Sequence, residues 1–226
     1  MARTSSILLG IALICGQTCG QMGCSQVVRD KPVLVPGMVK EIVVRVDHGN
    51  LEIAASAETT QVEIVRAARD AAAGQGSTHE IKDGVLTVEG RCGGLPKCRI
   101  NHRIRVPLDA KVTVEIKEGD VALMDVSGDI SVEVGLGNVS GLRLGAANTT
   151  VHTEGGNIDL IFAAKPQALT ANAAAGDVDL RVPAGDYRCD IDDKAKPEFG
   201  VKCVASETRT IAASTAVGRL SLRATD

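Results

Sequence analysis

Histidine is the side chain that most often serves as a general base or a metal ligand, so the four histidines are the first candidates for a catalytic or metal-binding site. None lies in the H-E-x-x-H pattern of zinc hydrolases, no serine lies in a G-x-S-x-G pattern, and no phosphate-binding G-x-x-x-x-G-K loop occurs. We therefore expect structural or surface roles for the histidines and predict that the chain is not an enzyme. The four are His48, His79, His102 and His152.

Aspartates that follow a glycine recur in the middle of the chain, at Asp120, Asp129 and Asp177. A row of stacked carboxylates is the arrangement with which a parallel β-helix enzyme would cleave a polysaccharide. However, Asn138 and Asn157 occupy the same place after a glycine, and an amide cannot replace a catalytic acid. Turn formation explains these positions more simply, because Asp and Asn both bond their own backbone in turns. A polysaccharide-acting enzyme of the parallel β-helix type stays as the alternative.

Two groups of residues resemble metal ligands. Cys92, Cys98 and His102 have a C-x5-C-x3-H spacing that matches no common zinc pattern. The stretch 155–160 is similar to the glycine-rich nonapeptide whose stacked copies bind calcium. That motif needs paired glycine turns repeated in register, and the repeat region of this chain holds one Gly-Gly pair. We therefore predict no metal site and no cofactor.

Four cysteines follow the N-terminal segment, and an even number of cysteines in an exported chain favours disulfides. Cys92, Cys98, Cys189 and Cys203 allow three pairings, and the sequence alone does not choose among them. We favour Cys92–Cys98 and Cys189–Cys203, because each of these pairs closes a short loop.

Cations and apolar residues alternate between residues 97 and 106, as they do in a strand with one buried face. His102 falls on the apolar side. The cations form what we call the basic stripe, a candidate site for an envelope polymer rich in phosphate or uronate. Alternatively, the stripe is a solvated strand face whose charges pair with acidic neighbours such as Glu115. The basic stripe consists of Lys97, Arg99, Arg103 and Arg105.

Residues 1–23 have the pattern of an export signal, because Arg3 is followed by an apolar run too short to span a membrane. Gly23-Cys24 resembles the bacterial lipobox, in which the cysteine is acylated and becomes the first residue, although Gln21 stands where leucine is usual. An acylated Cys24 would hold the chain to a membrane as a lipoprotein. Ordinary signal cleavage would instead give a periplasmic or extracellular protein, and both cases predict export to the cell envelope.

Composition limits both the core and the partners. Apolar residues make up 44% of the 226 residues, but two Phe, one Tyr and no Trp leave an aliphatic core and few aromatic platforms for stacking sugars. A polymer would therefore have to be bound by polar or charged side chains. The net charge of −3 is too small to indicate a nucleic-acid partner.

A three-residue signal organises residues 119–182: glycine, then Asp or Asn, then a β-branched residue. Copies begin at positions 119, 128, 137, 156 and 176, and the first three are nine residues apart. Each copy predicts a turn, because glycine reaches positive φ and Asp or Asn tolerates it. The alternating runs that follow, such as 130–134, predict strands with one buried face. We therefore expect an all-β fold of short stacked strands, either β-solenoid-like or a two-sheet sandwich.

The remaining chain divides around this region. Residues 24–39 contain Pro and Gly without a period and are predicted to be a linker, and residues 40–226 are predicted to be one β-repeat domain. Residues 67–76 are expected to form a loop. Further strands are expected at residues 42–46, 85–88, 169–173 and 210–213, and a hairpin is expected from residues 187–191 and 201–204.

These features resemble a known family. The export signal, the extended start Val43–Ile53, the Val106-Pro107-Leu108 segment and the serial Gly-Asp-Ile/Val turns are similar to the bacterial putative-adhesin domain of unknown function, DUF4097, over roughly residues 40–225. The resemblance implies a stacked β fold in the cell envelope with no established enzymatic activity, and it brings no binding residues. The four cysteines in the body of the chain depart from it.

The predicted function is a non-enzymatic module of the cell envelope or surface, either an adhesin-like binding domain or a scaffold, with an unknown ligand. The expected partner is an envelope polymer. The alternative within this class is another envelope protein bound through a sheet edge.

Overall fold

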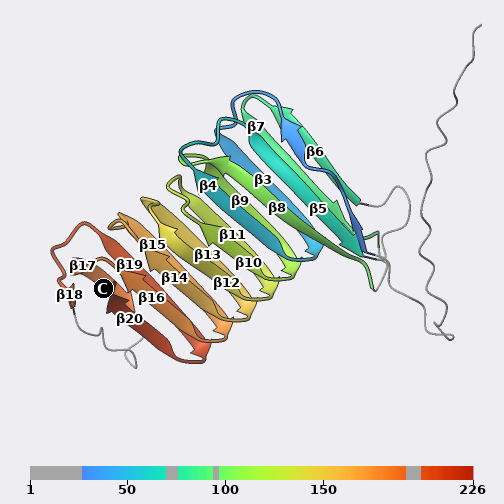
Figure 1. Cartoon of the computed structure of the whole chain (residues 1–226). Coiled ribbons are helices and arrows are strands. Elements are labelled where there is room, and N and C mark those ends of the chain that lie inside the picture. The colour runs from blue at the N-terminus through green and yellow to red at the C-terminus, as the bar shows by residue number, and fades with distance from the viewer. Residues whose placement is uncertain (1–26, 70–75, 94–96, 192–199, 226) are drawn as a thin grey trace, which may run out of the picture.

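Two β-sheets make up the part of the chain that the computed structural model describes, which comprises residues 27–69, 76–93, 97–191 and 200–225. Figure 1 shows their strands stacked side by side along one axis. The prediction of an all-β fold is confirmed, since every regular element in these residues is a strand. No helix in the described residues is long and apolar enough to cross a membrane.

Each sheet contains ten strands. The first sheet has the spatial order β1 (Val27–Arg29), β5 (Val62–Arg69), β8 (Arg99–Pro107), β4 (Leu51–Ser56), β10 (Val121–Met124), β12 (Val139–Leu144), β14 (Ile158–Phe162), β16 (Val178–Val182) and β20 (Leu220–Ala224), and β2 (Val33–Val35) also pairs with β5. The second sheet has the order β18 (Val201–Cys203), β17 (Gly185–Ile191), β19 (Thr210–Val217), β15 (Ala168–Ala175), β13 (Asn148–Gly155), β11 (Ile130–Leu136), β9 (Lys111–Glu118), β3 (Glu41–His48), β7 (Val85–Arg91) and β6 (Gly76–Lys82).

From β9 to β16 the chain alternates between the sheets, so that two consecutive strands form one coil. β9, β11, β13 and β15 run parallel and in register in the second sheet, and β10, β12, β14 and β16 do so in the first. The nine-residue signal therefore marks half a coil. Gly119 and Gly137 turn the chain from the second sheet to the first, whereas Gly128 turns it back. The result is a two-sheet solenoid.

The core lies between the sheets and is filled by every second side chain of each strand. Val121 and Leu123 on β10 are fully buried, and β11 alternates over residues 130–134 as its sequence predicts. Tyr187 is the largest fully buried side chain, and its hydroxyl donates a hydrogen bond of 2.7 Å to the Pro183 carbonyl. A buried phenol therefore keeps a polar partner inside an otherwise aliphatic core.

Glycine corners let successive coils approach closely. Gly119, Gly137 and Gly156 have φ values of 148°, 151° and 142°, and a Cβ on any of them would overlap the carbonyl oxygen of the corner glycine one coil earlier. The next residue continues the stacking, since Asp120 Oδ1 accepts the Asn138 backbone N–H at 2.9 Å. These contacts satisfy backbone groups that the sheets leave unpaired at the corners.

Three segments differ from the sequence predictions. The predicted linker contains β1 and β2, which pair antiparallel with β5. The predicted loop at residues 67–76 contains the end of β5 and the start of β6. Strand β6 was missed because its residues after Ser77 are all exposed, so it lacks the alternation of a half-buried strand. Finally, β17 and β18 are parallel and form no hairpin, because the chain returns to the start of β17, where Val201 lies beside Gly185.

Candidate functional site

The basic stripe lies on the outer face of the first sheet, along β8. The apolar residues of this strand and His102 are buried, whereas the arginines between them are exposed, as the alternation predicts. Lys97 is exposed just before the strand begins. All four cations are therefore accessible from solvent.

Two arginines of the basic stripe face carboxylates on neighbouring strands. Arg103 Nε lies 2.9 Å from Glu52 Oε2 on β4, and Arg105 Nη1 lies 3.1 Å from Glu63 Oε2 on β5. Exposed pairs of this kind contribute at most about 1 kcal/mol to stability. They nevertheless offset much of the positive charge that a polyanion would meet, so the geometry agrees with a solvated strand face.

The other cations of the stripe differ in their surroundings. Arg99 Nη2 lies 2.5 Å from Glu118 Oε1, at the end of β9 in the second sheet. Lys97 has no acidic partner in the part of the chain that the structure describes. Glu115, which the sequence suggested as a partner of the stripe, instead pairs with Arg45 in the second sheet at 3.0 Å.

A groove of about 590 Å³ crosses the same outer face beside the stripe. Its floor is low because the small side chains of Ala67, Ala122 and Ser140 line it from β5, β10 and β12. The Arg103–Glu52 ion pair also lines it. We call it the amide groove because three asparagine side chains, Asn50, Asn101 and Asn138, line it together with Asp120.

The polar residues at the corner edge of the amide groove form a ladder. Asn101 Oδ1 accepts the Asn50 N–H at 2.8 Å, and Asn50 Oδ1 accepts the Asp120 N–H at 3.1 Å. Asp120 Oδ1 accepts both the backbone N–H and the side-chain amide of Asn138. The second polar atoms of the first three residues, Nδ2 of Asn101 and Asn50 and Oδ2 of Asp120, have no partner among the described residues. Three neighbouring strands thus present two donors and one acceptor, held in place by the ladder.

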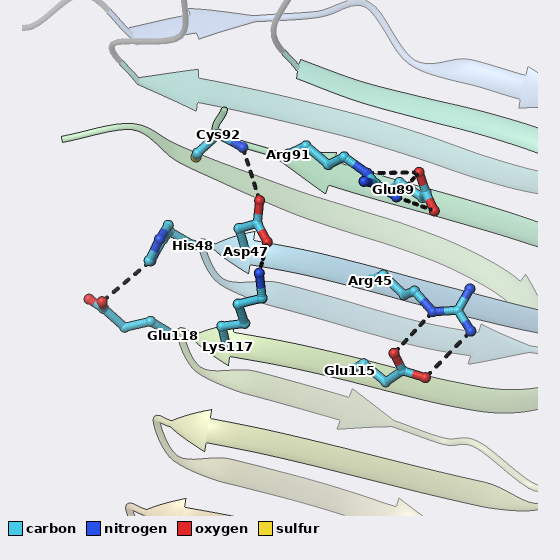
Figure 2. A network of polar contacts seen from close by, with 9 residues as sticks. All are labelled: Arg45, Asp47, His48, Glu89, Arg91, Cys92, Glu115, Lys117 and Glu118. Carbon is cyan, nitrogen blue, oxygen red and sulfur yellow. Dashed lines mark hydrogen bonds and ion pairs between the residues drawn. The ribbon is translucent and has the colours of Figure 1, made fainter. Parts of the chain in front are cut away.

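A second groove, of about 520 Å³, lies on the outer face of the second sheet over β7, β3, β9, β11 and β13. Gly135 on β11 keeps its floor low, since it has no side chain on the outer face. Its walls carry three ion pairs (Figure 2), which are Arg91–Glu89, Arg45–Glu115 and Lys117–Asp47.

The ion pairs hold carboxylates of the second groove in their charged form. The hydrogen bond from Lys117 Nζ, at 2.7 Å, lowers the pKa of Asp47, and the Cys92 N–H adds to this effect. Arg91 lowers the pKa of Glu89 in the same way, and Glu89 raises the pKa of Arg91. These groups keep fixed charges at neutral pH, so the second groove is suited to recognising charge and not to moving protons.

Both favoured cysteine pairs lie at disulfide distance. The Cα atoms of Cys92 and Cys98 are 5.6 Å apart, and those of Cys189 and Cys203 are 5.3 Å apart. The Cys92–Cys98 disulfide joins the end of β7 in the second sheet to the start of β8 in the first. The Cys92 N–H also donates to Asp47 Oδ2 at 3.3 Å, which ties this disulfide to the second groove (Figure 2).

His102 is buried inside the first coil and does not join the cysteines in a metal site. It is 3% exposed, and its Nε2 lies 2.8 Å from Ser77 Oγ. Burial lowers the pKa of His102 to about 4, and the charge of Arg66 acts in the same direction. A nucleophilic site needs a serine hydroxyl beside an imidazole, and a third group that orients the imidazole. However, no side chain among the described residues bonds His102 Nδ1, so no carboxylate or amide orients the ring as in a catalytic triad.

The remaining histidines lie at the surface. His48 Nδ1 is 3.4 Å from Glu118 Oε2 (Figure 2), and Arg99, which also contacts this carboxylate, is the main cause of the lowered pKa of Glu118. His79 on β6 and His152 on β13 are exposed.

The three aspartates that follow glycines do not form one row. Asp120 and Asp177 lie at one edge of the solenoid, and Asp129 lies at the other, where it accepts the Asn148 N–H at 3.2 Å. The Arg219 backbone N–H, at 2.8 Å, lowers the pKa of Asp177. The aspartates therefore lie at turns, as the sequence indicated, but their carboxylates bond backbone N–H groups of the next coil and not their own backbone. Among the described residues, no three His, Cys, Asp or Glu side chains form a group that could hold a metal ion.

The predicted export signal, residues 1–23, and the predicted acylation site Cys24 lie outside the described residues. The amide groove, by contrast, was missed from the sequence. Asp120 and Asn138 were assigned to turns only, and Asn101 lies in the predicted strand 97–106, where it was given no role. The side chains that line the groove come together only when the coils stack.

Two solved structures that are similar to this chain carry adhesion-related names. A putative cell adhesion protein from Clostridium sporogenes is 12% identical over 89% of this chain and all of its own, with a TM-score of 0.50. A putative adhesin from Bacteroides fragilis is 16% identical over 87% of this chain and 96% of its own, with a TM-score of 0.46. No family model and no curated protein matches the chain. At these identities the likeness concerns the fold alone.

Proposed function

We propose that this protein is a non-enzymatic binding module of the cell envelope that holds a polar, hydroxyl-rich polymer in the amide groove. The observation that carries the proposal is the row of Asn101, Asn50 and Asp120, whose second polar atoms are unbonded in the described part of the chain. A sugar hydroxyl both donates and accepts, so two amide donors beside one carboxylate acceptor match a glycan without any aromatic platform.

The polymer is expected to be neutral. Arg103 and Arg105 already pair with Glu52 and Glu63, so an acidic polymer would have to break these ion pairs to reach the cations. Binding through hydrogen bonds to amides should change little between low and high salt, whereas binding through the basic stripe should weaken as salt screens it.

Location in the envelope is part of the same proposal. The sequence pattern of residues 1–24 supports export, with Cys24 as the acylated first residue of the mature lipoprotein. Two disulfide pairs support an oxidising compartment. The resemblance to the putative-adhesin domain DUF4097 supports the same location.

Affinity electrophoresis tests the site, with neutral dextran or mannan or anionic alginate cast in the gel. We expect at least one neutral polysaccharide to retard the protein equally at about 50 mM salt, where screening of charges is weak, and at about 500 mM salt, where screening is strong. Ala122→Tyr, which fills the groove floor on β10, should abolish the retardation. Thr150→Tyr, on the outer face of β13 in the second sheet, is the matched control and should bind as the parent does.

Two outcomes would contradict the proposal. Unchanged retardation of Ala122→Tyr would remove the amide groove as the site. Retardation by alginate alone, lost at the higher salt, would assign binding to the basic stripe instead.

A further inference from the structure

We propose that the N-terminal end of the solenoid is a docking face for a lipid bilayer with anionic headgroups, so that the long axis of the solenoid stands away from the membrane. This end is formed by β1, β2 and β5 of the first sheet and by β6 of the second, opposite the end that carries β18 and β20 (Figure 1). The proposal is independent of whether the amide groove binds a polymer.

Large apolar side chains gather at this end and are exposed. Met38 is 77% exposed and Leu34 is 62% exposed, although neighbouring Val35 and Val39 are buried. Val33 is 39% exposed, although its register partner Ile64 points into the core. Four of the eight large apolar side chains that are exposed in the described residues lie at this end, and the other four are spread over the rest of the solenoid, at Leu108, Leu136, Leu142 and Val217. The end of the core is therefore incompletely covered by the chain itself.

The apolar residues of the two sheets meet at this end. Ile81 on β6 pairs with Leu86, a fully buried residue of β7, yet Ile81 is 37% exposed because β6 is the last strand of its sheet. A methyl group built on Gly37 would lie 3.7 Å from Ile81 Cδ1, so the segment that carries Met38 lies against β6. Ile81 and the segment of Met38 thus form one surface. Leu34 lies on the outer face of the edge strand β2, since its register partner Glu63 faces outward, where it pairs with Arg105.

Cations surround this surface. Lys31, Lys40 and Lys82 are exposed, and none has an acidic partner among the residues that the structure describes. On the sides of the solenoid, by contrast, most arginines are paired. Two acidic residues, Glu80 and Asp83, are also exposed here, so the local excess of positive charge is small. Lysines around apolar side chains favour anionic headgroups.

The chain itself indicates a bilayer as the occupant. Cys24, the predicted acylation site, precedes Val27 of β1 by three residues, and three residues of chain reach at most about 10 Å. β1 pairs with β5 at the same end of the first sheet. An acyl anchor at Cys24 would therefore hold this end close to the lipid, and inserting Met38 and Leu34 would fix its orientation.

The absence of tryptophan from the sequence allows a clean test. Met38→Trp and Val217→Trp each introduce a single reporter into the full chain, and Val217, at the end of β19, is 71% exposed in the native chain. With vesicles of phosphatidylglycerol and phosphatidylcholine, we expect the Met38→Trp emission to shift to the blue and to be quenched by lipids brominated in the acyl chains. Val217→Trp should show neither effect.

A second measurement tests the face without the anchor. In the mature chain that starts at residue 24 and carries Cys24→Ala, which has neither the export signal nor an acyl group, Leu34→Asp with Met38→Asp should lower the partition into the same vesicles by at least about tenfold, since two apolar side chains lose their insertion. Val217→Asp should leave the partition unchanged. The proposal is overturned if Met38→Trp is not quenched, if both reporters are quenched alike, or if the aspartate pair partitions as the parent does.

Discussion

At the scale of single residues, the surroundings of each titratable group fix the pH range in which it affects stability. The pKa of His102 is lowered to about 4 by burial, whereas the pKa values of Asp47 and Glu118 are lowered by cations at the surface. All three shifts make the folded state bind fewer protons than the unfolded chain in acid. The carboxylates affect stability only below their ordinary pKa values near 4, so His102 is the main cause of the pH dependence of stability between pH 6.5 and 4.

We therefore predict that stability falls as pH falls through this window. The unfolded chain protonates His102 near pH 6.5, while the folded protein resists protonation until about pH 4. The free energy of unfolding should be unaffected by this residue above pH 7 and should fall by about 3 kcal/mol between pH 6.5 and 4. Urea unfolding at several pH values, compared with His102→Gln, isolates the effect. Parallel pH curves for the two proteins would refute it.

Residue patterns predicted exposure better than they predicted partners. The alternation of residues 97–106 correctly placed the arginines of the basic stripe outside and His102 inside. Their partners could not be predicted, because Glu52 is 51 residues from Arg103 and Glu63 is 42 residues from Arg105. Partner choice depends on which strands lie side by side. The amide groove was missed for the same reason, since it needs side chains from five strands.

At the scale of elements, the corner glycines and the residues that follow them set the register of the coils. Gly156 has φ 142°, and a Cβ there would overlap the Gly137 carbonyl oxygen. Asn157 then donates its N–H to Asn138 Oδ1 at 2.9 Å. The corner is therefore held by close backbone contact and by hydrogen bonds from one coil to the next, and the backbone contact leaves no room for a side chain at the glycine.

Two neighbouring glycines provide a matched test of this corner. Gly156→Ala should lower the free energy of unfolding by about 2–4 kcal/mol, because it adds both a clash with backbone and an unfavourable φ. Gly155→Ala should change it by less than about 0.5 kcal/mol. Its Cβ would meet only the exposed side chain of Leu136, at 3.0 Å. Chemical denaturation of both variants checks the difference, and equal losses would show that the corner contact is unimportant.

The same local signals explain which elements the sequence could reveal. Gly-Asp and Gly-Asn turns together with two-residue alternation located the strands from β9 to β16, because both signals are read from neighbouring residues. Strand β6 carries neither signal, and β1 and β2 are too short to show alternation. The parallel pairing of β17 with β18 escaped prediction because strand direction depends on how the chain closes a coil, which the pattern does not encode.

At the scale of the whole molecule, the solenoid separates its surfaces. The two grooves lie on the sides of the stack, over β4, β10 and β12 and over β3, β9 and β11, whereas the apolar surface that contains Met38 and Ile81 lies at the N-terminal end. Docking of that end on a bilayer would leave both grooves accessible. Each central coil contacts only the coil before and the coil after it, so length can change without altering either surface.

Removal of one coil tests this modular organisation. Deleting residues 138–156 joins Gly137 to Asn157 and removes β12 and β13, so that β10 would pair with β14 and β11 with β15. The existing register allows this, because Val121, Val139 and Ile158 are aligned, as are Val132, Val151 and Ala171. We expect a folded β protein with one cooperative transition and a denaturant m-value lower by about a tenth.

Deleting residues 138–157 instead removes one further residue, which shifts β14 by one position and turns its apolar side chains outward. That control should unfold or aggregate, and equal folding of both deletions would contradict the register argument.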